Sequence, residues 1–370
     1  MGENRKFVVF GLTCIFLAVF ALGYSPGNAE AQAKKGDKLL FGMTSRDIAP
    51  PFAKAIIYGA KKRANKLGVE LVITNANNDV IKQIQQTDDL ITMGIKAYIV
   101  FSAGDTTAII PAVKKANEAK IPVAALDSCP EGGKIDYWLM NDNVAGGEKA
   151  AQAMVDEIKR RNAGKVPEGV IIEIIGAVGD SFSDDIGKGF HKVIDKYPQL
   201  KMATGEAKWS ADGAFQVTAD MITRYGKKVI GVFAYTPDLM GLGVVNAIKN
   251  AGYDPKDFVS AGVCMGPEGR DLIKAGQFHA IVNQPCLAMG ELSVQYLYDI
   301  LKGNPTPKIG DTITEPGALW SPAPVIKNWH ADGAFVNLYG PLVPQEVKPD
   351  DPRLWENQID EIVAGLKDLK

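Results

Sequence analysis

The chain has 370 residues, of which 46% are hydrophobic and 23% charged, with 41 basic and 43 acidic side chains. This is the composition of an ordinary globular protein, and it excludes a disordered chain, a collagen and a membrane protein with many spans. The formal net charge of -2 gives no attraction toward a phosphate backbone, so we expect no nucleic-acid partner.

The first residues have the pattern of a secretory signal peptide. Arg5 and Lys6 precede an apolar run over residues 7–24, and small residues suited to cleavage follow between Ala29 and Ala33. We therefore predict that residues 1–33 are removed and that the mature protein is soluble in the periplasm. An uncleaved membrane anchor is the alternative, because the apolar run is slightly long for a signal peptide.

From residue 38 onward, short apolar runs rich in β-forming residues alternate with amphipathic stretches. In chain order, the predicted strands of the first half are 39–43, 70–74, 97–101 and 123–126, and the predicted helices are 52–67, 79–93 and 107–119. After residue 143 the alternation restarts, with predicted strands at 170–175, 202–207, 229–235, 259–263 and 280–283 and helices at 146–160, 184–197, 211–225, 240–251 and 267–275. Helices between buried strands predict parallel sheets covered on both faces, so the fold class is α/β with two doubly wound lobes.

The chain is predicted to cross between the two lobes more than once, through a multi-strand hinge. The N-terminal lobe takes residues 34–142 and about 285–325, because the helix predicted at 287–302 packs back on it, and the C-terminal lobe takes residues 143–284. The tail over about 326–370 is predicted to extend in an ordered form across the hinge and the lobes. Ligands bind beyond the carboxyl ends of parallel strands, so the cleft between the lobes is the predicted site.

The sequence offers no catalytic or metal-binding motif. Its three histidines, His191, His279 and His330, are not at metal-ligand spacing, and neither HExxH nor CxxC occurs. The run Gly241-Leu242-Gly243 lacks the third glycine of a dinucleotide loop, so helix packing is the better interpretation. We therefore expect that the protein binds no metal and no cofactor and that it is not an enzyme.

Three cysteines remain after the signal peptide, which is too few for a disulfide framework. These are Cys129, Cys264 and Cys286. Buried thiols are the simpler interpretation, and one disulfide between Cys264 and Cys286 is the alternative.

An ordered set of short motifs over residues 38–303 resembles the bacterial periplasmic sugar-binding proteins of ribose-binding type. The motifs are Pro51-Phe52, Asn77-Asn78-Asp79, Gly94-Ile95-Lys96-Ala97, Leu126-Asp127, Asp142-Asn143, Gly187-Lys188-Gly189-Phe190, Asp238 to Gly243, and Gln284. The resemblance implies a type I periplasmic binding protein fold, and a monomer that closes on a small ligand at its hinge. It also implies delivery to the membrane permease and ATPase of an ABC importer, or reading by a chemosensory receptor.

The pocket of ribose-type proteins is not reproduced, because four of its positions differ. Here Pro50 stands for an asparagine, Ser128 and Asp184 stand for arginines, and Cys264 stands for an aspartate. A second branch, the autoinducer-2 and rhamnose-binding proteins, is more similar. Its motifs match at Asp127-Ser128, Ser183-Asp184-Asp185, Pro237-Asp238-Leu239 and residues 308–311, and Arg46 stands where that branch has a lysine. The ligand stays open between a sugar, a deoxy sugar, a polyol, an autoinducer-2-like signal and a less polar molecule.

A polyhydroxylated ligand needs charged side chains for its hydroxyl groups and aromatic planes for its C–H faces. The predicted ligand-binding set is Arg46, Phe52, Asp127, Ser128, Asp184, Asp185, Trp209, Pro237, Asp238 and Gln284. Each main candidate has a structural alternative. These are turn or helix capping for Asp127, Asp184, Asp185 and Asp238, an inter-lobe salt bridge for Arg46, core packing for Trp209, and a hinge role for Gln284.

Overall fold

The computed structural model describes residues 38–103 and 105–369. The predicted signal peptide lies outside the described residues. None of the helices in these two ranges is long and apolar enough to cross a membrane.

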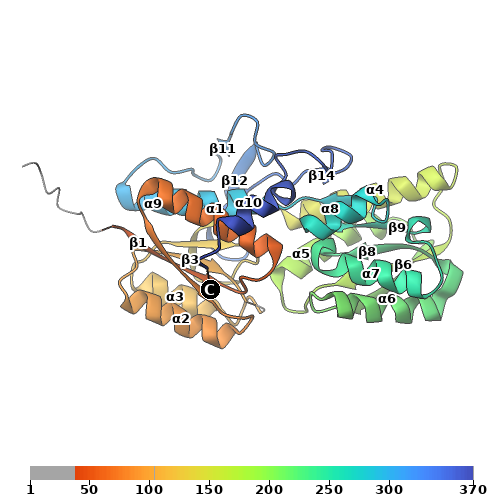
Figure 1. The fold of residues 1–370 in the computed structure, drawn as a ribbon, viewed down its shortest axis with the longest axis horizontal. Coiled ribbons are helices and arrows are strands. Elements are labelled where there is room, and N and C mark those ends of the chain that lie inside the picture. Colours follow the sequence, from red (N-terminus) through yellow and green to blue (C-terminus); the bar gives the residue numbers. More distant parts are fainter. Residues whose placement is uncertain (1–37, 104, 370) are drawn as a thin grey trace, which may run out of the picture. The chain divides into compact units, whose positions relative to one another are not determined.

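The described residues form two sheets of mostly parallel strands (Figure 1). The first sheet has the order β11-β12-β13-β5-β4-β3-β1-β2, and the second has the order β14-β10-β9-β8-β6-β7. The strands of the first are β1 (Leu40–Ser45), β2 (Glu70–Asn75), β3 (Ala97–Phe101), β4 (Val123–Leu126), β5 (Lys134–Met140), β11 (Thr312–Ile313), β12 (Ala323–Lys327) and β13 (Asp332–Asn337). Those of the second are β6 (Gly169–Ile175), β7 (Leu200–Glu206), β8 (Val229–Ala234), β9 (Val259–Val263), β10 (Ala280–Val282) and β14 (Leu342–Val343).

Helices cover both faces of each sheet, as the sequence predicts for doubly wound lobes (Figure 1). The first lobe has α1 (Pro51–Leu67), α2 (Val80–Thr92), α3 (Ile110–Glu118) and α9 (Cys286–Lys302). The second lobe has α4 (Asn143–Arg161), α5 (Ser181–Ile194), α6 (Ala211–Tyr225), α7 (Pro237–Asn250) and α8 (Gly266–Lys274). Short 3₁₀ helices lie at Gly226–Lys228, Pro255–Asp257 and Trp355–Gln358, and α10 (Ile359–Ala364) ends the tail. The central strands β3 and β4 are buried along their whole length, which explains their continuous apolar sequence.

Glycines allow neighbouring helices to pack with their backbones in contact. A Cβ at Gly290 of α9 would collide with the carbonyl oxygen of Ile56 in α1, and one at Gly189 of α5 would collide with that of Val144 in α4. Gly243 of α7 likewise packs against the backbone of α6. The interpretation of the Gly241-Leu242-Gly243 run as a helix-packing motif is therefore confirmed.

The chain crosses between the lobes at residues 141–142, 283–285 and 338–341, and the tail then returns over the hinge. Trp355 of this return donates from Nε1 to the carbonyl oxygen of Gln284 at 2.9 Å. Further on, Glu361 of α10 accepts a 2.8 Å hydrogen bond from Tyr58 of α1. The tail is thus attached to the second sheet through β14, to the hinge through Trp355 and to the first lobe through α10.

The sequence pattern does not predict β5 or the strands of the tail. Tyr137 and Trp138 of β5 follow Asp136, which interrupts the apolar run, and β5 pairs in parallel with the distant β13. These strands form through pairing between remote segments, which local periodicity does not report.

Candidate ligand-binding site

A cavity of about 360 Å³ opens between the two lobes at the carboxyl ends of their strands. The first lobe lines it with Arg46, Asp47, Pro50, Phe52, Asn78 and Asp127. The second lobe lines it with Phe182, Lys208, Trp209, Thr236, Asp238, Leu239 and Cys264, and Gln284 comes from a hinge crossing. The position agrees with the general rule for ligands of open parallel sheets.

The structure brings six of the predicted site residues to the cavity wall, namely Arg46, Phe52, Asp127, Trp209, Asp238 and Gln284. It places the other four elsewhere. Ser128 lies behind the wall and donates to Asp180 at 2.8 Å, while Pro237 is buried in the first turn of α7. On α5, Asp184 is exposed and Asp185 is buried away from the cavity.

Arg46 faces two buried carboxylates without direct hydrogen bonds to them. Its Nη1 lies 3.7 Å from Oδ2 of Asp127 and 3.9 Å from Oδ2 of Asp180, beyond ordinary hydrogen-bond distance. Its Nε makes a long 3.4 Å hydrogen bond to Asn78. The guanidinium therefore compensates the two charges while most of its donors stay free for a ligand.

Asp180 is a functional candidate that the sequence reasoning missed. It follows β6 and caps α5 by accepting a 3.0 Å hydrogen bond from the backbone N–H of Phe182. The sequence pattern could have predicted this role, because an aspartate that follows a buried strand and precedes a helix is typical of both a helix cap and a cleft residue. Asp180 is 1% exposed, and burial raises the pKa of its carboxyl against the opposing effect of Arg46.

Two hydrogen bonds hold Asp127 in place. Its Oδ1 accepts a 2.8 Å hydrogen bond from Nε2 of Gln284, and its backbone carbonyl accepts one of 2.9 Å from Nε1 of Trp138. Burial raises the pKa of Asp127 to about 6, and Asp180 adds to the rise, whereas Arg46 and Gln284 oppose it. The carboxylate is therefore ionised near neutral pH only at a cost in free energy.

The cavity wall concentrates unusual backbone conformations. Eight non-glycine residues in the described part of the chain have positive φ, and five of them line the cavity. These five are Asn78, Asp127, Lys208, Trp209 and Cys264. Such conformations cost about 1–3 kcal/mol each and cluster at functional sites.

The aromatic side of the cavity is built on Trp209 and Phe52. Trp209 packs edge-on against Phe182 with ring centroids 5.6 Å apart, and Phe52 packs in the same way against Phe101 at 6.0 Å. Gly176 makes room for the indole, because a Cβ there would collide with it. Two ring systems, one from each lobe, are thus available to the C–H faces of a ligand.

Several buried polar atoms at the cavity have no hydrogen-bond partner among the described residues. They are Nε1 of Trp209, Oγ1 of Thr236 and Oδ1 of Asp238. Oδ2 of Asp180, which faces Arg46 but is not part of the cavity lining, also has no hydrogen-bond partner in the described ranges. Burial, together with Glu268 and Asp127, raises the pKa of Asp238 well above its ordinary value. In its protonated form this carboxyl group can donate a hydrogen bond as well as accept one. Unsatisfied buried groups are costly, and a ligand with several hydroxyl groups would satisfy them.

The thiols are explained by packing. Cys129, Cys264 and Cys286 are free and buried, so the alternative of a disulfide between Cys264 and Cys286 is wrong. Cys264 lines the cavity and donates from Sγ to Oε1 of Gln284 at 2.9 Å. Across residues 38–103 and 105–369, no cluster of His, Cys, Asp or Glu could hold a metal ion.

Comparison with known proteins gives consistent matches. The family model for the periplasmic binding protein domain matches residues 41–305. The ribose import binding protein of Bacillus subtilis (strain 168) is 30% identical over 315 residues, which cover 84% of this chain and 97% of that protein. A xylitol-binding protein of Mycolicibacterium smegmatis is 32% identical over 258 residues, 70% of each chain.

Solved structures agree with the fold. A solute-binding protein of an ABC transporter from Mycobacterium smegmatis, with bound glycerol, has a TM-score of 0.66 and 27% identity, covering 73% of this chain and 90% of that chain. A sugar ABC transport substrate-binding protein from Bordetella parapertussis has a TM-score of 0.73 at 20% identity, covering 87% of this chain and 93% of that chain. These matches do not confirm the resemblance to the autoinducer-2 and rhamnose-binding branch.

Proposed function

Because this chain belongs to the periplasmic binding protein domain family, we propose that it is the substrate-binding protein of an ABC-type sugar importer. It captures a small polyhydroxylated molecule in the cavity between its lobes and delivers it to the membrane permease. Its relatives place it in the periplasm or elsewhere outside the cytoplasm.

The observation that carries the proposal is the set of unpartnered polar atoms on a cavity wall that also carries two aromatic rings. Thr236 and Trp209 supply unpaired atoms from the second lobe, and Arg46 supplies free donors from the first. A hydroxyl group placed between Arg46 and Asp127 accepts from the guanidinium and donates to the carboxylate. Charge-assisted hydrogen bonds of this kind are the strong ones, and neighbouring hydroxyl groups can use both.

Binding and closure follow from the same geometry. The ligand contacts both lobes, so it stabilises the arrangement in which they are together relative to one in which they are apart. The permease then recognises the closed form of the protein. No catalytic group is needed, and the ligand leaves chemically unchanged.

The ligand class that suits the cavity is a neutral sugar, deoxy sugar or polyol. Asp127 and Asp180 bring two carboxyl groups close to the guanidinium of Arg46, and Asp238 adds a third carboxyl group on the cavity wall. A ligand carrying its own carboxylate would meet this excess of acidic groups. Hydroxyl groups, which both donate and accept, match the mixture of atoms on the wall.

Thermal unfolding in the presence of a ligand panel tests the proposal. A ligand that binds only the native state raises the melting temperature. At a ligand concentration of one hundred times Kd, the free energy of unfolding increases by about 2.7 kcal/mol. The panel contains pentoses, hexoses, deoxy sugars, polyols, matched sugar acids and autoinducer-2. We expect a neutral hydroxylated compound to give a shift and to be recovered unchanged. A preference for the sugar acid, or conversion of the bound compound, would contradict the proposal.

A further inference from the structure

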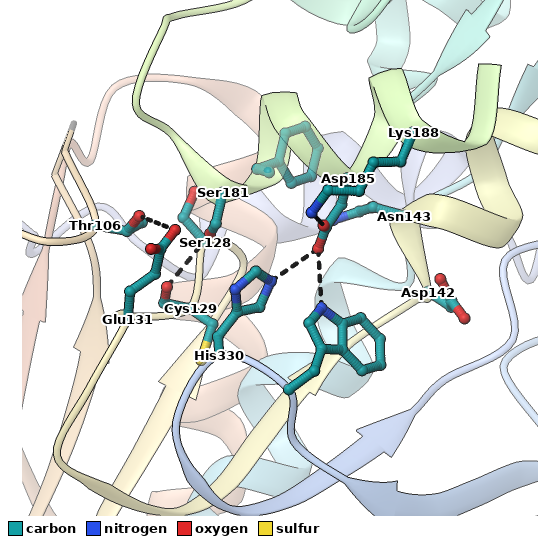
Figure 2. A network of polar contacts seen from close by, with 12 residues as sticks. Thr106, Ser128, Cys129, Glu131, Asp142, Asn143, Ser181, Asp185, Lys188 and His330 are labelled. Carbon is teal, nitrogen blue, oxygen red and sulfur yellow. Dashed lines mark hydrogen bonds and ion pairs between the residues drawn. The ribbon is translucent and has the colours of Figure 1, made fainter. Parts of the chain in front are cut away.

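A buried carboxylate of the second lobe is bonded to a loop of the first lobe, outside the cavity. Asp185 on α5 has a side chain only 1% exposed. Its Oδ2 accepts a hydrogen bond from Nε2 of His330 at 2.8 Å (Figure 2). The same oxygen accepts a second hydrogen bond from Nε1 of Trp329 at 3.3 Å. Both donors belong to the loop between β12 and β13 of the first sheet. The contact therefore joins the two lobes directly.

The carboxylate of Asp185 needs these partners in order to remain charged. Burial acts to raise the pKa of Asp185, but the hydrogen bonds from His330 and Lys188 outweigh it, so the pKa is lowered. Lys188 belongs to the same helix and reaches only the other oxygen, Oδ1, at 2.8 Å. If the lobes separate, Oδ2 loses both of its donors from the first lobe.

The loop that carries these donors is fixed in position. Trp329 and His330 pack against Trp138 with ring centroids 5.2 and 5.3 Å apart, and Oδ1 of Asn328 accepts from the backbone N–H of His330 at 2.9 Å. Trp138 in turn donates to the backbone carbonyl of Asp127. The first-lobe side of the contact is thus part of the same packed unit as a cavity residue.

The second-lobe side is also linked to the cavity, through α5. Asp180 at the start of this helix faces Arg46, and Asp185 follows slightly more than one turn later. Between them, Ser181 donates to the carbonyl oxygen of Cys129 in the first lobe at 3.3 Å (Figure 2). Because both carboxylates belong to the start of α5, the helix brings the carboxylate that faces Arg46 and the inter-lobe carboxylate to the first lobe together.

We propose that Asp185, Trp329 and His330 form an inter-lobe latch that sets the affinity for ligand without touching it. The inference rests on the proposed binding function, and it assigns Asp185 a role other than ligand contact. The latch contributes to the closed arrangement alone, so weakening it lowers the closed population. The apparent Kd then rises by the same factor for every ligand, since it equals the intrinsic Kd divided by the competent fraction.

Ligand titration of matched variants of the full chain tests the latch. The variants are Asp185→Asn, His330→Ala and the two combined, with Lys188→Met as the control that removes only the bond within α5. Loss of a buried hydrogen bond to a charged group predicts a Kd increase of about ten-fold for each single variant. The double variant should be less than additive, because both changes remove one contact. Lys188→Met should leave Kd within about two-fold, because the bond that it removes lies within α5 and is the same whether the lobes are together or apart.

The pattern across ligands separates a latch from a ligand contact. For at least three compounds that the wild-type protein binds, the latch predicts one common factor and an unchanged ranking. A direct contact changes the ranking, and that result would overturn the latch. If Asp185→Asn fails to fold, Trp329→Phe removes only one donor from the less buried side of the contact and is judged by the same pattern.

A ligand-free measurement makes the test independent of the proposed function. Small-angle scattering of the ligand-free chain should give a larger radius of gyration for Asp185→Asn than for Lys188→Met, because the lobes separate more often. If the wild-type chain binds no compound, the binding function fails and scattering alone decides the latch. An unchanged Kd together with an unchanged radius of gyration overturns the latch even where sugars bind.

Discussion

Asp127→Asn should weaken ligand binding and at the same time stabilise the ligand-free protein near neutral pH. The substitution keeps the shape of the side chain but removes a carboxylate that burial disfavours. Arg46 keeps Asp180 as a partner, so the guanidinium is not left alone. A residue held for packing alone would show the opposite sign, with stability lost on substitution.

The magnitude follows from the pKa of Asp127, which rises from an ordinary 3.8 to about 6 in the folded protein. A rise of about two units corresponds to about 3 kcal/mol, at about 1.4 kcal/mol per unit. The folded state binds the proton more tightly than the unfolded state. Wild-type stability therefore falls as pH increases from about 4 to about 6, and the variant lacks this part of the fall.

Denaturant unfolding of both proteins between pH 4 and pH 7.5 measures the effect. The difference in unfolding free energy, variant minus wild type, should increase by about 3 kcal/mol up to about pH 6 and stay level from there to pH 7.5. Taking the difference cancels the titration of other groups, such as Glu157, whose pKa is lowered to about 2. Titration with the best ligand at pH 7.5 should show a Kd raised by about ten- to hundred-fold, as expected for a lost hydrogen bond to a charged group.

A flat difference across the pH range would refute the reasoning about Asp127, because burial would then not oppose its ionisation. A Kd within about two-fold of wild type would refute its place in the binding site, whatever the stability shows. The two readouts are separate, since stability is measured without ligand and affinity is measured on folded protein.

Three further predictions concern Thr236, Glu356 and the cysteines. Thr236→Val removes an unpartnered buried hydroxyl group, so the ligand-free protein should gain about 1 kcal/mol while Kd rises about five-fold, and loss of stability would contradict this. Burial raises the pKa of Glu356 to about 8, so wild-type stability should fall between about pH 4.5 and pH 8. Denaturant unfolding of Glu356→Gln should lack that fall. If stability changed with pH in the same way in the variant and the wild type, the prediction would be contradicted. Alkylation followed by peptide mass spectrometry should label Cys129, Cys264 and Cys286 only after denaturation, and labelling of the native protein would show that they are accessible.

The sequence is informative about the fold wherever an element is stabilised locally. Strands β3 and β4 are continuous apolar runs because both faces are buried, and the helices show their own amphipathic period. Strand β5 is different, since its pairing with β13 depends on residues almost two hundred positions away. No local pattern encodes a pairing of that kind.

The candidate site was partly predictable for a similar reason. Arg46 and Asp127 directly follow strands, so the sheet alone determines where they lie. The acidic pair Asp184 and Asp185 depends on where α5 begins, and the cap is Asp180, several residues earlier than the predicted helix start. Each residue turns a helix by about 100°, so this shift directs Asp184 to solvent and Asp185 to the first lobe. Asp180 becomes the carboxylate that faces Arg46.

The two tail strands determine when each lobe can be completed. The first sheet gains β13 beside β5, and the second gains β14 beside β10, but residues 332–343 that form both strands follow every other strand of the two sheets along the chain. Domains usually fold in order of synthesis, the N-terminal one first. Here β13 joins β12 to β5 inside the first sheet and β14 forms one edge of the second, so neither sheet is complete until residues 332–343 are in place.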